Sequence, residues 1–205
     1  MKNVMVVIID YGMGNVSSVE KALNFLNIKN IISNDKNIIK NSSAILLPGV
    51  GSFSQGMNNL RELNLVDLLT DEVVNKKKPF LGICLGMQLI FEKGSEPHEC
   101  DGLGWIKGEV KKLDIDGLKI PHMGWNDIEV QNNKFYSKIN NFDFYFIHSY
   151  HVLPTFKSEI AATVNYGIDI VASIQKDNIF ATQFHPEKSQ QSGLCLLKEF
   201  FETIC

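Results

Sequence analysis

The strongest constraint on the fold is an alternation of short apolar runs with longer amphipathic segments in the first half of the chain. Four runs have the length and the β-branched or apolar composition of strands: residues 4–9, 30–33, 44–47 and 80–83. Residues 15–26 and 56–75 carry apolar side chains at the three- and four-residue spacing of a helix. This order is typical of βαβ units, in which helices cover both faces of parallel strands. The first half therefore predicts an α/β fold.

After Gly94 the sequence changes to shorter strand-like runs separated by glycine, asparagine and aspartate. These runs are residues 108–113, 126–130, 144–147, 161–164, 170–175 and 179–183. We expect them to form an antiparallel or mixed extension of the sheet, closed by a helix over residues 192–203. Because the 205 residues contain no repeat or linker, one domain over residues 1–205 is expected.

The charge and the start of the chain limit the classes of partner. A formal net charge of −3 offers no basic surface of the kind that nucleic acids or anionic membranes bind. The apolar run at residues 4–9 is too short for the core of a signal peptide or for a spanning helix. We therefore expect a cytoplasmic protein without nucleic-acid or membrane partners.

The four cysteines give no sign of disulfides or of a structural metal site. Cys84, Cys100, Cys195 and Cys205 are unevenly spaced, without a C-x-x-C pair or paired histidines nearby. The H-E-C segment at residues 98–100 is interpreted as a solvated loop. No metal is predicted.

Cys84 lies in a segment with the form of a nucleophile elbow. The sequence G-I-C-L-G at residues 82–86 follows a predicted buried strand. Its glycines leave room for a sharp turn into a helix, whose N-terminus favours a thiolate. There the backbone N–H of Leu85 would donate to an oxyanion, so the chemistry would be acyl transfer. Without a base nearby, Cys84 would be a buried structural cysteine.

His185 is the candidate base for this thiol. It ends a predicted strand, and Pro186 keeps it out of helical geometry. Residues two apart in an extended segment face the same side, so Glu187 can hold one ring nitrogen while the other faces the thiol. A Cys84–His185–Glu187 set at the ends of parallel strands is therefore one hypothesis, and chance proximity of a His and a Glu is the other.

Two glycine-rich segments follow other predicted strands. The sequence D-Y-G-M-G-N-V-S at residues 10–17 approaches a dinucleotide-binding fingerprint, with Asp35 at the distance of a ribose-binding acid, but Ser17 replaces the third glycine. NAD binding is therefore kept as an alternative, and no cofactor is predicted. The sequence P-G-V-G at residues 48–51 suits a backbone that approaches a ligand closely or reorients a peptide.

Six segments together resemble the glutaminase subunits of imidazole glycerol phosphate synthases, which are class I glutamine amidotransferases. They are D-Y-G-M-G-N at residues 10–15, P-G-V-G at 48–51, G-I-C-L-G-M-Q at 82–88, P-H-M-G-W-N at 121–126, H-S-Y at 148–150 and Q-F-H-P-E-K-S-Q at 183–190. The cysteine and His-Pro-Glu segments indicate the wider class. The segment at residues 121–126 narrows the resemblance to this subunit type.

The resemblance implies a flavodoxin-like, three-layer fold with a mixed, mostly parallel central sheet and an antiparallel extension. It also implies hydrolysis of L-glutamine to glutamate and ammonia, with Cys84 as nucleophile, His185 as its base and Glu187 orienting His185. The residues that it implies for the oxyanion and glutamine-binding site are Gly49, Val50, Gly51, Leu85, Gln88, His148, Ser149 and Tyr150.

A heterodimer is implied as well, in which a TIM-barrel cyclase subunit uses the ammonia to form imidazole glycerol phosphate and AICAR in histidine biosynthesis. The implied interface positions are Asn15, Met123, Trp125, Asn126, Tyr145 and Lys188. The few residues after Glu187 leave no space for a domain that binds an ammonia acceptor. Because free ammonia is mostly protonated near pH 7, we expect a dry passage into the partner, and weak activity without it.

Several alternatives stay open at this point. A paralogous glutaminase would supply a synthase of surface-sugar amidation, which the bulky Trp105 in G-L-G-W at residues 102–105 favours. A stand-alone cysteine hydrolase or peptidase, or a non-enzymatic binding module with Cys84 buried, would need no partner. Independently of these functions, an ordinary core position is the alternative to an interface role for Tyr145, and a structural role is the alternative for His122.

Overall fold

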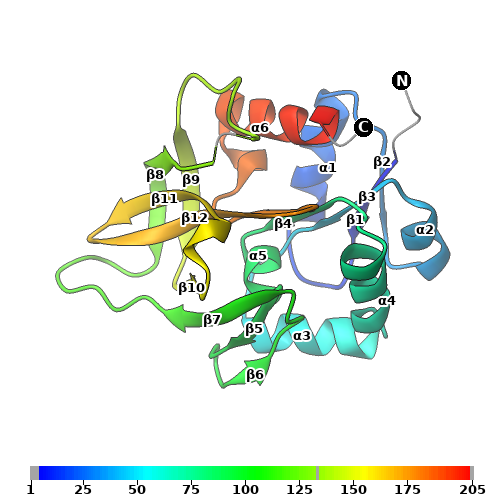
Figure 1. Cartoon of the computed structure of the whole chain (residues 1–205), viewed down its shortest axis with the longest axis horizontal. Helices are drawn as coiled ribbons and strands as arrows, with labels where there is room; N and C mark the ends of the chain where they lie inside the picture. The colour runs from blue at the N-terminus through cyan, green and yellow to red at the C-terminus, as the bar shows by residue number, and fades with distance from the viewer. Residues whose placement is uncertain (1–4, 133, 204–205) are drawn as a thin grey trace.

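The computed structural model describes residues 5–132 and 134–203, so Val4 of the first predicted strand and Cys205 lie outside the described residues. Within them, one sheet has nine strands in the order β2-β1-β3-β4-β13-β12-β11-β8-β9, and a second has four in the order β10-β7-β5-β6 (Figure 1). The predicted α/β class is confirmed.

Parallel strands form one half of the large sheet. They are β1 (Val6–Ile9), β2 (Asn30–Ser33), β3 (Ala44–Leu47), β4 (Phe80–Ile83) and β13 (Ile179–Thr182). Every pairing among them is parallel. All residues of β1, β3, β4 and β13 are buried, which explains their nearly continuous apolar sequences.

The other half of this sheet is the predicted antiparallel extension. It consists of β12 (Ile168–Lys176), β11 (Ile160–Tyr166), β8 (His122–Val130) and β9 (Asp143–His148). Each strand runs antiparallel to the one before it, starting from β13. Strand β8 begins at His122 and not at the predicted Asn126. The apolar residues of its first part, Met123 and Trp125, are exposed, so this part does not have the buried apolar face by which strands were recognised.

The second sheet was predicted only in part. It contains β5 (Phe91–Gly94), β6 (Cys100–Asp101), β7 (Ile106–Lys112) and β10 (Tyr150–Pro154). The sequence indicated β7 alone. Strand β5 buries only its two end residues, and one residue separates β10 from β9, so neither shows a strand pattern of its own.

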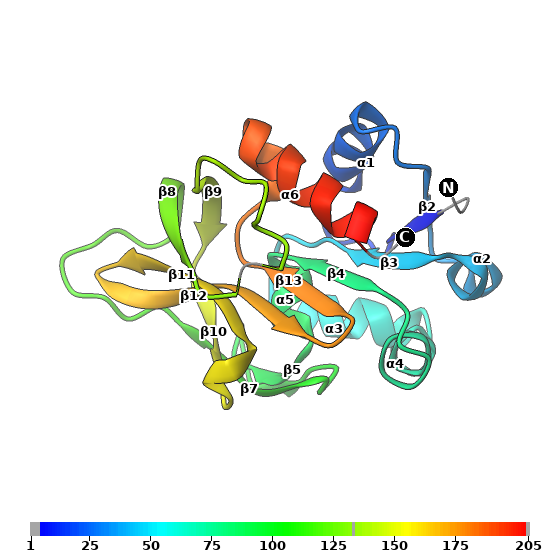
Figure 2. The same cartoon turned by 45° about the horizontal axis from the view of Figure 1, so that its top comes forward.

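Helices cover both faces of the large sheet (Figures 1 and 2). They are α1 (Val16–Phe25), α2 (Lys36–Asn41), α3 (Phe53–Glu62), α4 (Val66–Thr70), the π-helical turn η1 (Asp71–Asn75), α5 (Leu85–Leu89), the 3₁₀ turns η2 (Lys157–Glu159) and η3 (Pro186–Lys188), and α6 (Gln190–Thr203). Alternate residues of β1 face two cores: Val6 and Ile8 pack with α1 and α6, and Val7 and Ile9 with α3 and α5. No helix in the described part of the chain is long and apolar enough to cross a membrane.

The predicted single helix over residues 56–75 is wrong, because the chain breaks it after Glu62. Asn64 adopts a left-handed φ of 53°, and the N–H of Leu65 returns to the carbonyl of Leu60 at 2.9 Å. This is the hydrogen-bond pattern of a helix C-terminus. The left-handed position there is most often glycine, and asparagine is the next most favoured residue. Helix α4 and η1 then continue in a new direction.

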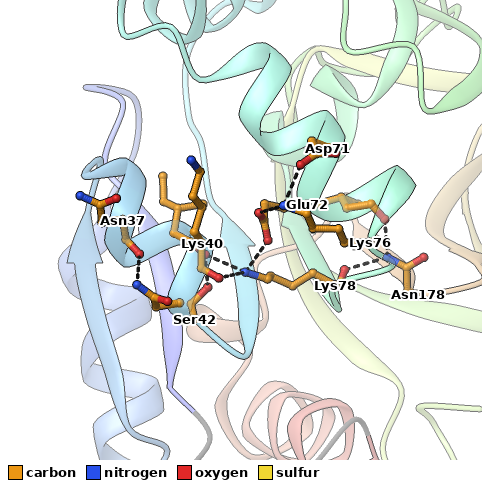
Figure 3. A network of polar contacts seen from close by, with 11 residues as sticks. Asn37, Lys40, Ser42, Asp71, Glu72, Lys76, Lys78 and Asn178 are labelled. Carbon is orange, nitrogen blue, oxygen red and sulfur yellow. Dashed lines mark hydrogen bonds and ion pairs between the residues drawn. The ribbon is translucent and has the colours of Figure 1, made fainter.

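A polar network centred on the buried side chains of Lys78 and Glu72 lies just before the start of β4 (Figure 3). The Lys78 ammonium contacts Glu72 Oε2 at 2.7 Å and donates to the carbonyls of Ile39 and Lys40, both at 2.8 Å. Lys76 contacts the other Glu72 oxygen at 2.7 Å. Lys78 therefore joins η1 to the end of α2 two residues before β4 begins.

Candidate active site

Cys84 occupies the tip of a strained turn between β4 and α5. Its φ of 53° and ψ of −106° lie outside the regions that ordinary residues favour. A Cβ on Gly82 would lie 2.9 Å from the carbonyl oxygen of Gly86, and one on Gly86 would overlap the carbonyl oxygen of Leu47. The two glycines are therefore required by this turn, which has the predicted elbow form.

His185 and Glu187 lie beside this turn, at the carboxyl end of β13. The Nδ1 atom of His185 is 2.8 Å from Oε1 of Glu187, and both side chains are almost fully buried. Because a carboxylate only accepts, Nδ1 carries the proton of this hydrogen bond. Nε2 is buried and has no hydrogen-bond partner among the described residues, so it is left for Cys84.

The charges around His185 favour its protonated form. Burial alone lowers the pKa of His185, but the charge of the nearby Cys84 thiolate and the Glu187 carboxylate raise that pKa to about 10. The imidazole therefore holds a proton at neutral pH whenever Cys84 is ionised. This arrangement supplies both a nucleophile and a proton donor for a leaving group.

A cavity of about 330 Å³ opens at Cys84. Its lining includes seven of the eight residues expected around glutamine: Val50, Gly51, Leu85, Gln88, His148, Ser149 and Tyr150. The eighth, Gly49, is not among the lining residues but accepts a hydrogen bond from the N–H of Leu85. A larger cavity of about 480 Å³ lies along Trp125 and Ser189 without Cys84, so the chemistry belongs to the smaller one.

Glu96 also lines the cavity, although no sequence pattern pointed to it. Burial raises the pKa of Glu96, and a backbone hydrogen bond from Phe53 opposes this in part. The negative charge of Glu96 adds to burial in raising the pKa of Tyr150, so the two side chains face the same space. Glu96 is the only carboxylate among the described lining residues. In the sequence Glu96 lies in a polar loop, where no feature distinguishes it from an ordinary surface carboxylate.

The expected oxyanion donor is occupied in this structure. The N–H of Leu85 donates to the carbonyl oxygen of Gly49 at 3.3 Å, while the hydroxyl of Tyr11 donates to the carbonyl of Pro48 at 2.9 Å. The peptide between Gly49 and Val50 therefore points its oxygen at the place where the oxyanion would lie. Turning this peptide over would free the N–H of Leu85 and add that of Val50.

The segment that resembled a dinucleotide fingerprint has structural uses instead. The carboxylate of Asp35 caps α2 by accepting from the N–H groups of Asn37 and Ile38, at 2.8 and 3.0 Å. A Cβ on Gly14 would lie 3.0 Å from the Cα of Gly49. The loop after β1 thus supports residues 48–51, and its glycines allow that close approach.

His148 and His122 form a neutral pair at the side of the cavity. His148 Nδ1 lies 2.9 Å from the carbonyl of Tyr150, and its Nε2 lies 3.0 Å from Nδ1 of His122. Burial lowers the pKa of His148 to about 3 and that of His122 to about 4. Both rings are therefore uncharged at neutral pH, and each is held by its hydrogen bonds.

The expected interface residues are only partly brought together. Trp125 and Met123 point out of β8 and are 45% and 58% exposed. The ring of Trp125 meets that of Tyr145 at 6.1 Å, and Lys188 Nζ lies 6.0 Å from the Tyr145 ring. Asn126 points to the opposite side of β8, where it donates to the carbonyl of Asn165. Asn15 caps α1 through its side chain.

Comparisons with known proteins agree with this geometry. The family described as "Glutamine amidotransferase class-I" matches residues 7–204. "Imidazole glycerol phosphate synthase subunit HisH 1" of Campylobacter jejuni is 50% identical over 96% of this chain and 98% of its own. The subunit HisH of Aquifex aeolicus is 48% identical over 95% of this chain and 94% of its own.

Solved structures show the same fold at much lower identity. "Structure of PurLQS from Thermotoga maritima" aligns with a TM-score of 0.76 at 16% identity, covering 98% of this chain and 99% of that one. "Crystal structure of glutamine amidotransferase" aligns with a TM-score of 0.75 at 20% identity, covering 97% and 98%. The chain therefore belongs to the class I glutamine amidotransferase family and, within it, to the group of the HisH subunits.

Proposed function

We propose that this chain is the glutaminase subunit of an imidazole glycerol phosphate synthase, which hydrolyses L-glutamine and passes the ammonia to a cyclase subunit. The observation that carries the proposal is the strained Cys84 elbow beside a His185 whose Nδ1 is held by Glu187 at 2.8 Å. Relatives that bear the HisH name are 48–50% identical to this chain, and the match covers nearly their full length.

The chemistry follows from the three side chains. The Cys84 thiolate attacks the side-chain amide carbon of glutamine, and the negative charge moves to the amide oxygen. Protonated His185 then gives its proton to the nitrogen, the C–N bond breaks, and ammonia leaves a thioester on Cys84. Water, deprotonated by the now neutral His185, cleaves the thioester to glutamate and restores the thiol. Glu187 keeps the imidazole in the required tautomer throughout.

The cavity offers complementary groups for the rest of the substrate. Glutamine carries an α-ammonium group, and the Glu96 carboxylate is the matching charge on the wall. The N–H groups of Leu85 and Val50 would bind the amide oxygen after the Gly49–Val50 peptide turns over. We propose that the partner favours the turned form, because the present form occupies the Leu85 donor.

The partner is proposed to be a TIM-barrel cyclase subunit that docks over Met123, Trp125, Tyr145 and Lys188. Two of these side chains are large, apolar and exposed, as in the centre of a protein interface. Trp105, which favoured a surface-sugar paralogue, packs in the core edge-on to Phe80 at 5.0 Å and donates to Thr70. Its bulk is therefore structural. We further propose one cytoplasmic domain over residues 1–205 that needs no cofactor.

Glutamate formation from L-glutamine tests the proposal, measured for the chain alone and with a cyclase subunit and its nucleotide substrate. We expect weak activity alone, strong activation in the complex, and none for Cys84→Ala in either setting. Full activity without a partner would contradict the channelling part. Failure of the folded chain to complement a histidine auxotroph would indicate a different ammonia acceptor.

A further inference from the structure

We propose that Gln183 is a further catalytic residue, whose side-chain N–H donates to the Cys84 sulfur and stabilises its thiolate. The inference rests on the proposed role of Cys84 as nucleophile. Gln183 follows β13 directly, has no exposed surface, and places Nε2 at 3.7 Å from Sγ of Cys84. That distance is within the range of a hydrogen bond to sulfur.

Neighbouring hydrogen bonds determine which end of the Gln183 amide faces the sulfur. The carbonyl of Tyr150 can only accept, so the Gln88 atom at 3.0 Å from it must be the nitrogen Nε2. The same Gln88 nitrogen lies 3.1 Å from Gln183, so the Gln183 atom there must be the acceptor Oε1. This leaves Nε2 of Gln183, a donor, as the atom beside Cys84.

The Gln183 donor and the carbonyl oxygen of Ile147 favour different protonation states of Cys84. The carbonyl oxygen of Ile147 lies 3.9 Å from Cys84 Sγ and accepts from the S–H group. An N–H donor prefers the ionised sulfur, because a hydrogen bond to a charged acceptor is stronger than one to a neutral acceptor. The other titratable side chains that interact with Cys84 are His185, the base, and the buried Tyr11.

Gln183 also links the nucleophile to the cavity wall. Both N–H groups of Gln88 are used by Tyr150 and Gln183, so only its oxygen remains to contact glutamine. The strand of Tyr150 and the turn of Cys84 are thus joined through two amides. Turning the Gln183 amide over would place its oxygen, and not its N–H donor, beside the sulfur.

The rate of Cys84 alkylation by iodoacetamide, followed by peptide mass spectrometry from pH 5 to pH 9, tests this role without turnover. Gln183→Met keeps length and volume but removes the donor, and Gln183→Glu keeps the shape and the acceptor for Gln88. We expect the rate at pH 7 to fall about tenfold in Gln183→Met, with a pH profile displaced to higher pH, since one hydrogen bond to a charge is lost. The fall in Gln183→Glu should be at least as large, because its carboxylate also repels the thiolate. Gln175→Met makes the same change in a buried glutamine of β12 and should leave the rate within about twofold.

Labelling of Cys195 in the same samples reports whether each variant keeps its fold. Unchanged rates and profiles at Cys84 in both Gln183 variants would overturn the inference, even though Cys84 is reactive. A wild-type Cys84 no more reactive than Cys195 would instead contradict the proposed nucleophile. The two failures are therefore distinguishable.

Discussion

Replacement of Lys78 by methionine tests how much the polar network just before β4 contributes to the stability of the fold. Its ammonium contacts Glu72 and two backbone carbonyls of α2, which uses all three of its N–H donors (Figure 3). The side chains of Lys78 and Glu72 are only 10% and 3% exposed. Methionine keeps the apolar stem, leaves both carbonyls without this donor, and leaves the buried carboxylate with Lys76 as its remaining cation.

The expected loss follows from this geometry. Removing one partner of a buried ion pair costs about 3–5 kcal/mol. Because Lys76 still contacts Glu72 at 2.7 Å, we expect the lower end, about 3 kcal/mol. In a chain of this size each kcal/mol lowers Tm by about 2–4 °C, so Tm should fall by about 6–12 °C.

Urea unfolding at pH 7, followed by circular dichroism, measures the change. Lys77→Met is the matched control, because Lys77 and its partner Asp177 are 59% and 66% exposed at a separation of 3.5 Å. That pair should contribute less than about 1 kcal/mol. A loss for Lys78→Met no larger than for Lys77→Met would refute the reasoning.

The same network predicts a pH dependence. Burial raises the pKa of Glu72, but hydrogen bonds from Lys76 and Lys78 outweigh it and hold this pKa below its ordinary value of 4.5. A carboxylate with a lowered pKa in the folded state stabilises the fold above its unfolded pKa, and this is lost as the pH falls through the folded value. The difference between wild type and Lys78→Met should therefore be full at pH 7 and shrink below about pH 4.5.

Three substitutions test the site in the complex. Glu187→Gln should lower kcat about a thousandfold, because His185 loses the carboxylate that sets its tautomer; a loss under tenfold would argue against that role. Gly49→Ala should abolish activation by the partner and cost about 1–3 kcal/mol of stability, because the added Cβ would overlap the Tyr11 hydroxyl. Activation by the partner at the wild-type level would contradict this. Glu96→Gln should raise KM for glutamine about tenfold with little change in kcat, and an unchanged KM would exclude Glu96 as the ammonium partner.

The elements that sequence predicted well are those whose burial pattern is uniform. Strands β3 and β4 start and end where the apolar runs do, because every residue of a covered parallel strand must be apolar or small. Asn64 was the only sequence sign of the break in the predicted helix over residues 56–75. The apolar residues at helical spacing on both sides of Asn64 favoured one continuous helix instead. The short strands β5 and β6 carried no such signal, since pairing and not burial defines them: β5 pairs with β7, and β6 pairs with β5.

The site was predictable where backbone geometry imposes a residue type. Cys84 stands between two glycines that the turn needs, and His185 follows β13 and directly precedes Pro186, which begins η3, so both could be found in one sequence. Glu96 and Gln183 could not be found in this way. Their proximity to Cys84 depends on the fold of the whole chain. Glu96 stands in a polar loop, and Gln183, although it begins the segment at residues 183–190, carries no local sign of a contact with the cysteine.

The most direct test of the central claim is covalent labelling of the complex by a diazoketone analogue of glutamine, read by peptide mass spectrometry. We expect one label per chain, on Cys84; excess L-glutamine should prevent the labelling, and glutamate formation should be lost in proportion to it. Labelling of another residue together with lost activity, or glutamate formation by Cys84→Ala at the wild-type rate, would contradict it.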